Sequence, residues 1–399
     1  MNNTKSKGII AYLGPVDFPN GGAAARRILG NAKALVKAGY EVHIGSGQVP
    51  TSSSENSFIY QDLKVHSLGE RTAESYPKLI KHLMYITMGS KTKTWLDNMS
   101  PKPDVVILYS GYTPYLLKLQ PWCKKHKIPL IFDAVEWYEA SHQSLGFLSP
   151  YQMNIEYSMR YLTIKSKNTI SISSYLDKYY KKNGCNSIVV PPTLDVKSIT
   201  PNLTPSNSQR LTIGYAGTPG KKDLFNNYLE AILTFDPSGE RINFVVAGVT
   251  EEELLKYPAL VHRRIKKIPN TITCLGKVQQ SVAIRLIKTA DFSVLLRPQE
   301  RYANAGFPTK VVESLTMGTP VITNLTSDLC NYINDGKEGI ICNDHSSASL
   351  IIALGKATQL DKKQLALMRI EARKKAEESF DFRLYHEKLA LFIENADLI

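Results

Sequence analysis

The sequence predicts an α/β protein made of two Rossmann-like domains with parallel sheets. Short apolar runs recur along the whole chain, each bounded by turn residues, as buried strands of a parallel sheet require. Stretches with helical periodicity separate these runs, which favours alternating strands and helices. The pattern stops at a proline-rich stretch, residues 191–210, and then starts again. Two similar halves joined by a hinge are therefore expected.

The composition supports this class. A length of 399 residues suits two domains of ordinary size, and 43% hydrophobic with 21% charged residues argues against disorder. The five cysteines show neither paired nor metal-like spacing, which fits a reducing compartment. The first apolar run, residues 8–13, is too short for a signal peptide, and no run approaches the roughly 20 residues of a membrane span. We expect a cytoplasmic protein.

The first half opens with a strand over residues 8–13, a loop over 14–22 and a helix over 23–38 that Gly39 ends. Further buried strands are predicted at residues 40–44, 105–109, 130–132, 169–172 and 187–190. In the second half, a helix is predicted over 224–234 and a charged helical stretch over 362–395. The strands predicted there are residues 211–215, 242–247, 271–275, 292–296, 321–323 and 339–342.

The segment NAGFPTKVVESLTMGTPVI, residues 304–322, is the most informative one. It follows the apolar strand DFSVLL, and Pro308 suits the first turn of a helix. Gly318 ends that helix and Pro320 blocks its continuation before the next strand. The loop therefore lies at the carboxyl end of a strand, where open parallel sheets bind ligands beside helix N-termini.

Two further loops at strand ends are candidates for anion or sugar binding. Gly21 and Gly22, followed by three alanines, allow a ligand to approach a helix N-terminus closely. The alternative is a turn whose alanines pack helix on sheet. The motif is not GxGxxG and no acid follows the next strand, so a nicotinamide cofactor is disfavoured. The loop GTPGKKD, with Gly217 and Lys222, suits a diphosphate, although an exposed turn with solvated lysines is the alternative.

Three charged side chains extend this expectation in the second half. Lys310 and Glu313 share a helix face, where Lys310 would bind phosphate and Glu313 would accept hydroxyl hydrogen bonds from a ribose. Arg297 ends a predicted strand and points toward the same crevice. The alternatives are a surface ion pair for the first two and a solvent-facing cation for Arg297.

In the first half, DAVEWYEASH follows the strand at 130–132. Asp133, Glu136 and His142 are candidates for polarising a hydroxyl or stabilising positive charge at a sugar carbon. A helix cap is an equally good interpretation of Asp133.

The formal charge of +13 is uneven, since residues 76–130 hold nine lysines and two aspartates with no arginine or glutamate. This stretch suits anionic lipid, an acidic substrate or simply a solvated surface. Nucleic acid is least favoured, because no arginine-rich or aromatic platform pattern occurs. Apolar residues at 79, 80, 83, 84 and 86 form either an amphipathic membrane-touching helix or the core face of an ordinary one.

Taken together, these segments resemble glycosyltransferases of family 4, which have the GT-B fold. FPTKVVESLTMGTPVI is similar to the donor-site signature of that family. GGAAARR with AKALVKAGYEV resembles its first loop and helix, and SISSYLDKYY with VVPPTLD resembles the end of its first domain. IGYAGTPGKKD with LEAI resembles the start of the second domain, and ESFDFRLYHEKLALFI resembles the closing helix.

The resemblance implies two domains facing across a cleft. It places an acceptor-side domain at residues 1–195, a linker at 196–210, a donor domain at 211–375 and a helix packing back on the first domain at 376–399. It also implies sugar transfer from a nucleotide donor with retention of configuration and without a metal or other cofactor.

The resemblance also assigns roles to individual residues. Glu313 would hold the ribose, and Lys222, Lys310 or Arg297 the diphosphate. Asp133 or Glu136 would lie near the reacting carbon, and Lys222 would also assist catalysis. The remaining donor-binding positions are Gly21, Gly22, Gly217, Asn304, Ala305, Gly306, Phe307, Pro308 and Thr309.

The sequence departs from the family at two positions. Ala305 stands where the signature usually has a first Glu, and Thr218 stands where an Arg is usual. The hypothesis is a cytoplasmic hexosyltransferase, peripheral at the inner membrane face, that acts on a saccharide or lipid-linked saccharide in bacterial surface glycan synthesis. The alternative is a non-catalytic partner subunit of GT-B type that binds nucleotide or saccharide.

Overall fold

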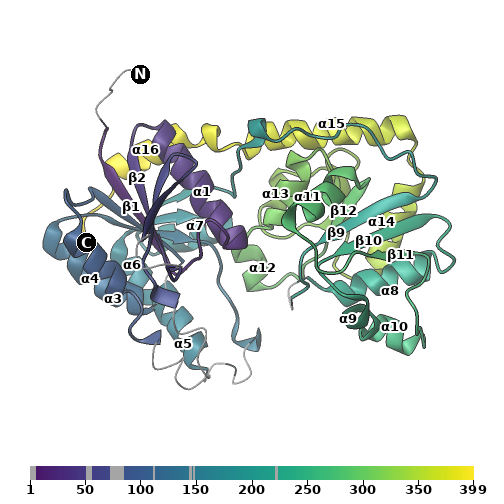
Figure 1. The fold of residues 1–399 in the computed structure, drawn as a ribbon, viewed down its shortest axis with the longest axis horizontal. Helices are drawn as coiled ribbons and strands as arrows, with labels where there is room; N and C mark the ends of the chain where they lie inside the picture. The colour runs from purple at the N-terminus through teal and green to yellow at the C-terminus, as the bar shows by residue number, and fades with distance from the viewer. Residues whose placement is uncertain are drawn as a thin grey trace. The chain divides into compact units, whose positions relative to one another are not determined.

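A computed structural model of the chain describes residues 6–50, 56–71, 85–110, 113–142, 146, 149–220 and 223–399. The chain forms two compact units (Figure 1). Unit 1 comprises Met1–Asp195, Asn304–Phe307 and Phe382–Ile399. Unit 2 comprises Val196–Ala303 and Pro308–Asp381. In the described part of the chain, no helix is both long enough and apolar enough to cross a membrane.

Unit 1 is built on an eight-stranded sheet with the order β3-β4-β2-β1-β5-β6-β7-β8. All neighbouring strands are parallel except the antiparallel pair β3 and β4. The strands are β1 (Ile9–Gly14), β2 (Glu41–Ser46), β3 (Ser57–Tyr60), β4 (Leu63–Ser67), β5 (Val105–Tyr109), β6 (Leu130–Ala134), β7 (Asn168–Ser171) and β8 (Asn186–Val189).

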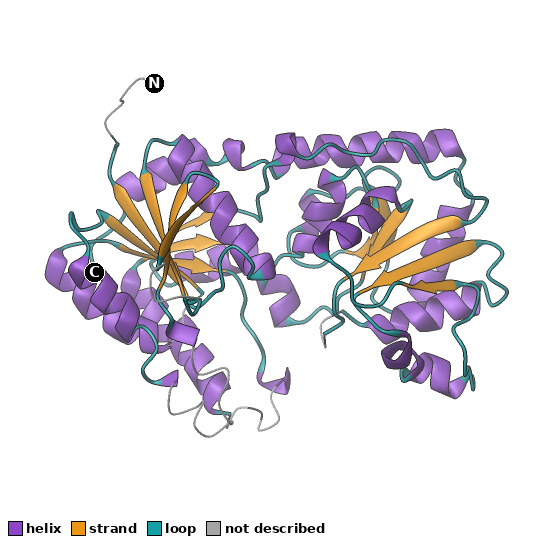
Figure 2. Ribbon diagram, viewed as in Figure 1, coloured by secondary structure: helices purple, strands orange, loops and turns teal. Residues whose placement is uncertain are grey.

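Helices lie on both faces of this sheet (Figure 2). They are α1 (Gly22–Lys37), α3 (Ser90–Asn98), α4 (Thr113–His126), α5 (Pro150–Tyr157), a π-helix (Ser158–Leu162), α6 (Thr163–Ser166), α7 (Ser174–Lys182) and α16 (His386–Glu394). The core joins strand residues such as Tyr12 and Ile107 to Leu389 and Phe392 of α16, so the C-terminal helix completes unit 1. Burial of such apolar surface is the main stabilising contribution.

Unit 2 has a six-stranded, wholly parallel sheet with the order β11-β10-β9-β12-β13-β14. Its strands are β9 (Leu211–Ala216), β10 (Ile242–Ala247), β11 (Ile272–Cys274), β12 (Phe292–Leu295), β13 (Val321–Asn324) and β14 (Gly339–Cys342). Its helices are α8 (Phe225–Phe235), α9 (Glu251–Leu255), α10 (Pro258–His262), α11 (Gln280–Thr289), α13 (Thr309–Thr316), α14 (Ser347–Thr358) and α15 (Lys362–Ser379). The short α12 (Arg301–Ala305) precedes α13.

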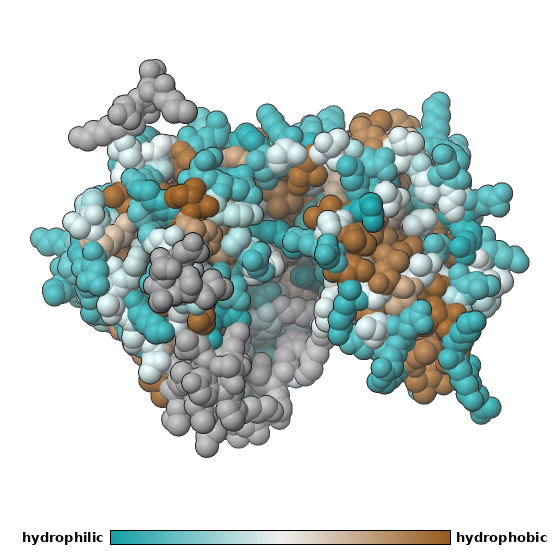
Figure 3. Space-filling view, viewed as in Figure 1, coloured by the Kyte–Doolittle hydropathy of each residue, from teal (hydrophilic) through white to brown (hydrophobic). Residues whose placement is uncertain are grey.

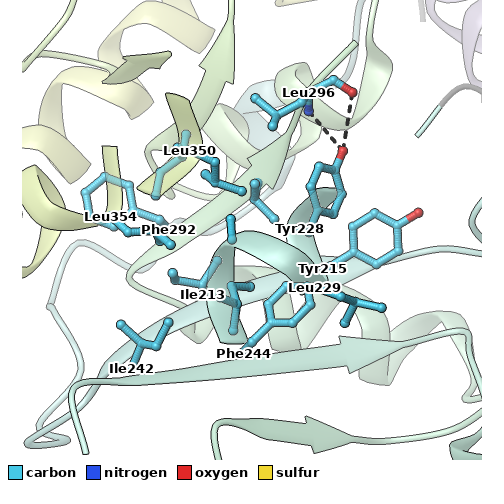
Figure 4. Packing of buried hydrophobic residues seen from close by; sticks show 14 of the residues in the cluster. Ile213, Tyr215, Tyr228, Leu229, Ile242, Phe244, Phe292, Leu296, Leu350 and Leu354 are labelled. Carbon is cyan, nitrogen blue, oxygen red and sulfur yellow. Dashed lines mark hydrogen bonds between the residues drawn. The ribbon is translucent and has the colours of Figure 1, made fainter. Parts of the chain in front are cut away.

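Aromatic and branched side chains fill the core of unit 2 (Figure 4). Phe244 of β10 and Phe292 of β12 are fully buried, and Leu350 of α14 packs against the same cluster. Tyr228 of α8 belongs to this core, but its hydroxyl accepts a hydrogen bond from the backbone N–H of Leu296 at 2.9 Å. A buried hydroxyl needs such a partner, and this one fixes the end of β12.

The surface of both units is mainly hydrophilic where Figure 3 shows it, with hydrophobic residues exposed in separate patches. This matches the net charge of +13.

The predicted fold class is confirmed: two Rossmann-like units with parallel sheets. One hairpin was not predicted, and one predicted helical stretch differs from the structure. The sequence did not suggest the hairpin of β3 and β4, whose short strands lie at the sheet edge. The helical stretch expected over 362–395 is two helices, α15 and α16, because the chain turns between Phe380 and Tyr385. There the carboxylate of Asp381 accepts a hydrogen bond from the backbone N–H of Lys197 at 3.3 Å.

Candidate functional site

A cluster of polar side chains lies at the carboxyl ends of the strands in unit 2. Tyr215, near the end of β9, donates a hydrogen bond from its hydroxyl to Oδ2 of Asp223 at 2.8 Å. Nζ of Lys310, from the first turn of α13, lies 3.0 Å from the same oxygen and 3.2 Å from the Tyr215 hydroxyl. The ammonium group also lies 4.5 Å from the centre of the Tyr215 ring, within cation–π range. The loop after β9 and the start of α13 thus meet at one carboxylate.

Two glycines allow the loop after β9 to come this close. Gly217 has φ +138°, and a Cβ atom there would lie 3.0 Å from Nζ of Lys310. Gly248, after β10, has φ +103°, and a Cβ atom there would lie only 2.5 Å from the carbonyl oxygen of Gly217. A side chain at either position would strain the backbone, and at Gly248 it would displace the loop. The backbone of Gly217 is therefore held beside the Lys310 ammonium group.

Arg297 follows β12, and its backbone is fixed on both sides. Its N–H donates to Oδ1 of Asn324 at 2.9 Å, and its carbonyl accepts from Nδ2 of Asn324 at 2.8 Å. The preceding residue, Leu296, is held by Tyr228 (Figure 4). The Nε atom of Arg297 is buried and has no hydrogen-bond partner among the described residues. A buried donor without a partner is costly, and a bound ligand would supply the missing acceptor.

The charges of this cluster do not balance. Burial alone would raise the pKa of Asp223, but the charge of Lys310, the Tyr215 hydrogen bond and the charge of Arg297 together lower it. Burial lowers the pKa of Lys310, and Arg297 adds to this effect, while Asp223 opposes it. Two cations therefore share one carboxylate, and the cluster suits an anionic ligand.

The N-terminus of α13 adds backbone donors beside this cluster. Its N-cap residue, Pro308, has no side chain that can accept from the first N–H groups. Helix N-termini carry a partial positive charge and bind phosphate through such groups. Glu313 lies one turn after Lys310 on the same helix and is half-buried.

The strand-end charges of unit 1 are arranged differently. Asp133, at the end of β6, is fully buried, and its Oδ1 lies 2.7 Å from an NH2 nitrogen of Arg27 in α1. Its other oxygen accepts from the Tyr12 hydroxyl at 2.5 Å. The guanidinium group also donates to the carbonyl oxygens of Val190 and Pro191 at 2.5 and 3.0 Å. Asp133 is thus the internal counter-ion of Arg27, and its surroundings favour a structural role.

The other candidates of unit 1 have local partners. Glu136 accepts a hydrogen bond from the Tyr138 hydroxyl. Gly22 has φ +63°, and a Cβ atom at Gly21 would lie 2.1 Å from the carbonyl oxygen of Asp17. The turn therefore requires both glycines, which supports the packing interpretation while the ligand role stays a prediction. The uncapped start of α1 leaves backbone donors there.

The segment Asn304–Phe307 groups with unit 1. Ala305 is fully buried, and its carbonyl oxygen accepts from the Ser173 hydroxyl at 2.7 Å. Phe307 and Pro308 are buried as well. Lys222 and the side chain of His142 lie outside the described residues.

The structure thus brings together Gly217, Arg297, Lys310 and the start of α13, all expected to bind the donor. Sequence reasoning missed Tyr215 and Asp223, which hold Lys310, and Asn324 and Tyr228, which hold Arg297. Asp223 ends the predicted GTPGKKD loop, so its position was visible, but its pairing with a lysine 87 residues away was not. No group of three or more metal-ligating side chains occurs in the residues that the structure describes.

Comparisons with known proteins agree with this description. Residues 210–359, which lie in both units but mainly in unit 2, match the family model described as glycosyl transferases group 1. The chain is also 27% identical over 107 residues to an Escherichia coli (strain K12) protein, WcaL, whose name assigns it to colanic acid biosynthesis as a glycosyltransferase. That match covers only 26% of each chain.

Solved structures extend the likeness to nearly the whole chain. Sucrose-phosphate synthase from Thermosynechococcus elongatus aligns with a TM-score of 0.71 at 12% identity, covering 97% of this chain and 98% of that one. Anabaena Alr3699/HepE, solved in complex with UDP and glucose, aligns with a TM-score of 0.67 at 13% identity, covering 97% and 99%. The chain therefore has the GT-B fold of these proteins.

Proposed function

We propose that this chain is a retaining glycosyltransferase of family 4 that moves a hexose from a nucleotide donor to a saccharide or lipid-linked saccharide. The observation that carries the proposal is the cationic cluster of Lys310 and Arg297 at the strand ends of unit 2. The match of residues 210–359 to group 1 glycosyl transferases supports it. The UDP and glucose bound to HepE favour a uridine nucleotide, and the WcaL relative favours bacterial surface glycan synthesis.

In this proposal, unit 2 holds the leaving nucleotide. Lys310, Arg297 and Lys222 neutralise the diphosphate, and the amides at Gly217 and at the start of α13 donate to its oxygens. Nε of Arg297 gains the acceptor that it lacks within the described residues. Glu313 accepts the two ribose hydroxyls. The other assigned positions are Gly21, Gly22, Asn304, Ala305, Gly306, Phe307, Pro308 and Thr309.

The chemistry follows from where charge develops. As the bond between the sugar carbon and the phosphate oxygen breaks, negative charge grows on the diphosphate. The transition state carries more of this charge than the ground state does. Fixed cations and amides therefore stabilise the transition state more, which lowers the barrier. The acceptor hydroxyl attacks the same face of the sugar, and its proton passes to the leaving phosphate oxygen. No cofactor is proposed, because the cations would perform the neutralisation that a divalent ion performs elsewhere.

The proposal changes the expectation for unit 1. The Asp133 carboxylate accepts from Arg27 and Tyr12 on both oxygens, so we no longer assign it to the reacting carbon. Glu136 stays a candidate, and its carboxylate accepts a hydrogen bond from the hydroxyl of Tyr138.

A donor screen tests the proposal. Unfolding temperatures of the full chain are measured with UDP-, GDP-, dTDP- and CMP-sugars, followed by product analysis with the best donor. We expect a UDP-sugar to raise the unfolding temperature and to be consumed when acceptor is present. Glu313→Ala should weaken that donor about tenfold or more, because a carboxylate–hydroxyl pair is lost. The matched control is Glu252→Ala, which truncates an exposed glutamate of unit 2. No shift with any nucleotide sugar would refute the proposal.

We further propose a cytoplasmic enzyme that associates with the inner membrane face. The lysine-rich stretch at 76–130 motivates this, although its apolar residues 79, 80, 83 and 84 lie outside the described residues. Met153, Tyr157 and Tyr161 add an exposed stripe at helical spacing. Tyrosines of this kind are common at membrane interfaces. Sedimentation with anionic vesicles at low salt, reversed at high salt, is expected; absence of binding at low salt would reject the association.

A non-catalytic binding subunit is the second candidate. Ala305 favours it, because its side chain is a buried methyl group where the family signature has a carboxylate. Thr218, exposed in the loop after β9, also lacks the usual guanidinium group. Product formation with any donor and acceptor pair would exclude this candidate. Tight nucleotide binding without turnover across the full panel would favour it.

A further inference from the structure

A cavity lies wholly within unit 1, between the β3–β4 hairpin and α3. Its volume is about 480 Å³, within the range typical of small-molecule sites. Among the described residues, one wall comes from the hairpin and the segment after it, and the other from α3. The lining residues are Asn56, Ser57, His66, Ser67, Leu68, Ser90, Lys91, Thr94, Trp95 and Asn98. None of them belongs to the donor site proposed for unit 2.

A series of side-chain hydrogen bonds runs across the sheet and ends at Ser57 on one side of the cavity. The Ser57 hydroxyl lies 2.8 Å from Nδ1 of His66, and Nε2 of His66 lies 3.1 Å from Nδ1 of His43. Nε2 of His43 lies 2.8 Å from a carboxylate oxygen of Glu41. The hydrogen bonds from Lys64 and His43 lower the pKa of Glu41, so the carboxylate accepts.

When both histidine rings are neutral, this series of hydrogen bonds fixes which atom donates and which accepts in each of them. Glu41 accepts from Nε2 of His43, so Nδ1 of His43 accepts from Nε2 of His66. Nδ1 of His66 then accepts the Ser57 proton. Burial, together with the charges of His43 and Lys64, lowers the pKa of His66 to about 4, which keeps its ring neutral near pH 7. The lone pairs of Ser57 are left to accept a hydrogen bond from a ligand in the cavity.

The opposite side offers an aromatic platform. Trp95 lines the cavity and is partly exposed, whereas the other two tryptophans, Trp122 and Trp137, are buried. The His66 ring packs against Trp95 with centroids 4.9 Å apart at 45°, which fixes the indole. A Cβ atom at Gly45 would lie 3.7 Å from Cζ3 of Trp95, so the indole also rests on the sheet there. A rigid indole presents a flat apolar surface that contacts the C–H face of a sugar ring.

The rim is polar but nearly uncharged. The amides of Asn56 and Asn98 are exposed and have no partner within the described residues, so each offers donors and an acceptor. Among the described residues, the lining contains no carboxylate. The cation described there, Lys91, donates to the carbonyl oxygen of Gly69 at 2.7 Å. An aromatic surface with neutral amides and hydroxyls matches a ligand that has many hydroxyl groups and no charge.

We propose that this cavity binds a neutral saccharide, stacked on Trp95 and hydrogen-bonded to Ser57, Asn56 and Asn98. The site goes beyond the proposed transfer reaction, because it needs neither the nucleotide nor unit 2. A growing or completed glycan held there would stay with the protein while unit 2 exchanges its donor.

The test uses the full chain and a panel of methyl glycosides of glucose, galactose and mannose with disaccharides of the same sugars. Binding is measured by titration calorimetry and by tryptophan fluorescence, which reports on the partly exposed Trp95. We expect at least one saccharide to bind and to change the fluorescence. Trp95→Ala should weaken binding more than tenfold, whereas Trp95→Phe should retain it and lose the fluorescence change.

Substitutions of exposed residues distinguish loss of the binding site from a folding defect. Asn98→Ala and Ser57→Ala remove exposed groups and should each weaken binding about three- to tenfold. The matched control is Asn207→Ala, an exposed asparagine of unit 2, which should bind as the unaltered protein does. UDP affinity, measured in parallel, should stay unchanged in all of these variants. The proposal is overturned if no saccharide of the panel binds, or if binding survives both Trp95→Ala and Asn98→Ala at full strength.

Discussion

Both units place charged residues at the carboxyl ends of their strands but balance them differently. In unit 1, Arg27 and Asp133 are 2% and 0% exposed and neutralise each other, and Tyr12 and backbone carbonyls satisfy the rest. In unit 2, Lys310 and Arg297 share the single carboxylate of Asp223, and one guanidinium nitrogen lacks a partner within the described residues. A balanced buried pair holds a fold together, whereas an unbalanced, partly open one is available to a ligand.

This difference explains why the two aspartates that follow strands have different roles. Both accept from a tyrosine hydroxyl and a cation. Among the described residues Asp133 contacts no second cation, so its pair with Arg27 leaves no excess charge to attract an anion. Asp223 positions Lys310 without cancelling Arg297. Substitutions that remove the counter-ion of Arg27 in unit 1 or a cation of the Asp223 cluster in unit 2 test this difference.

The largest effect is expected from Asp133→Asn in unit 1. The substitution leaves Arg27 buried without a counter-ion, and removing one partner of a buried pair costs about 3–5 kcal/mol of unfolding free energy. All three tryptophans, Trp95, Trp122 and Trp137, lie in unit 1, so urea unfolding followed by tryptophan fluorescence reports on that unit.

The matched control is Lys7→Gln, which removes the cation of the exposed ion pair between Lys7 and Glu394 in unit 1 and should leave the transition in place. UDP affinity of Asp133→Asn, measured below its unfolding midpoint, should equal that of the unaltered protein. A stable Asp133→Asn protein without turnover would instead return Asp133 to the reacting carbon and contradict the comparison.

The second largest effect is expected on turnover, when a cation is removed from the cluster in unit 2. Lys310→Met removes a cation from the diphosphate, and losing one preorganised electrostatic group lowers kcat by about 10²- to 10³-fold. The measurement is kcat/KM with the best donor of the screen. The exposed lysine variant Lys256→Met is the control and should keep full activity.

A second substitution separates lost catalysis from a disturbed cluster. Lys310→Met leaves Asp223 with less compensation, whereas Lys310→Met with Asp223→Asn removes that carboxylate charge too. If the cation itself acts on the donor, the double variant stays inactive while tryptophan fluorescence shows unit 1 unchanged. Recovery of activity in the double variant would show that Lys310 serves only to neutralise Asp223.

The sequence predicts the strands of both sheets well because parallel strands are buried on both faces and give continuous apolar runs. The strands at 105–109, 242–247 and 339–342 were predicted with their observed bounds. The β3–β4 hairpin was missed because Ser57–Tyr60 is half exposed at a sheet edge, where no apolar run is required.

The candidate site was predictable only in part, for a related reason. Lys310 and Gly217 could be placed at strand ends from loop and helix signals, since these signals are local in sequence. The pairing of Lys310 with Asp223 and of Arg27 with Asp133 joins residues about a hundred positions apart. Periodicity carries no information about such contacts. Asp133 therefore had the same local signals as a catalytic acid.

The smallest effect is expected in the pH dependence of nucleotide binding. Burial and the neighbouring Arg297 lower the pKa of Lys310, with Asp223 opposing them. Lys310 then loses its proton at a lower pH than a lysine in water, and the neutral amine no longer neutralises a diphosphate. UDP affinity should fall about tenfold as pH rises through this lowered pKa, since a hydrogen bond to a charged group contributes about 1.5 kcal/mol. Lys310→Arg, which stays protonated, should show no such fall.

The stability of unit 2 should change in the opposite direction over the same pH range. A lysine with a lowered pKa binds more protons in the unfolded state, so the free energy of unfolding rises with pH between the lowered pKa and the ordinary value near 10.4. Hydrogen exchange of the β9 amides measures this stability without the tryptophans of unit 1. Affinity that falls while protection rises would identify one buried ammonium group as the source of both. If both fell together, general alkaline unfolding would be the cause, and the cationic excess of unit 2 would lose its support.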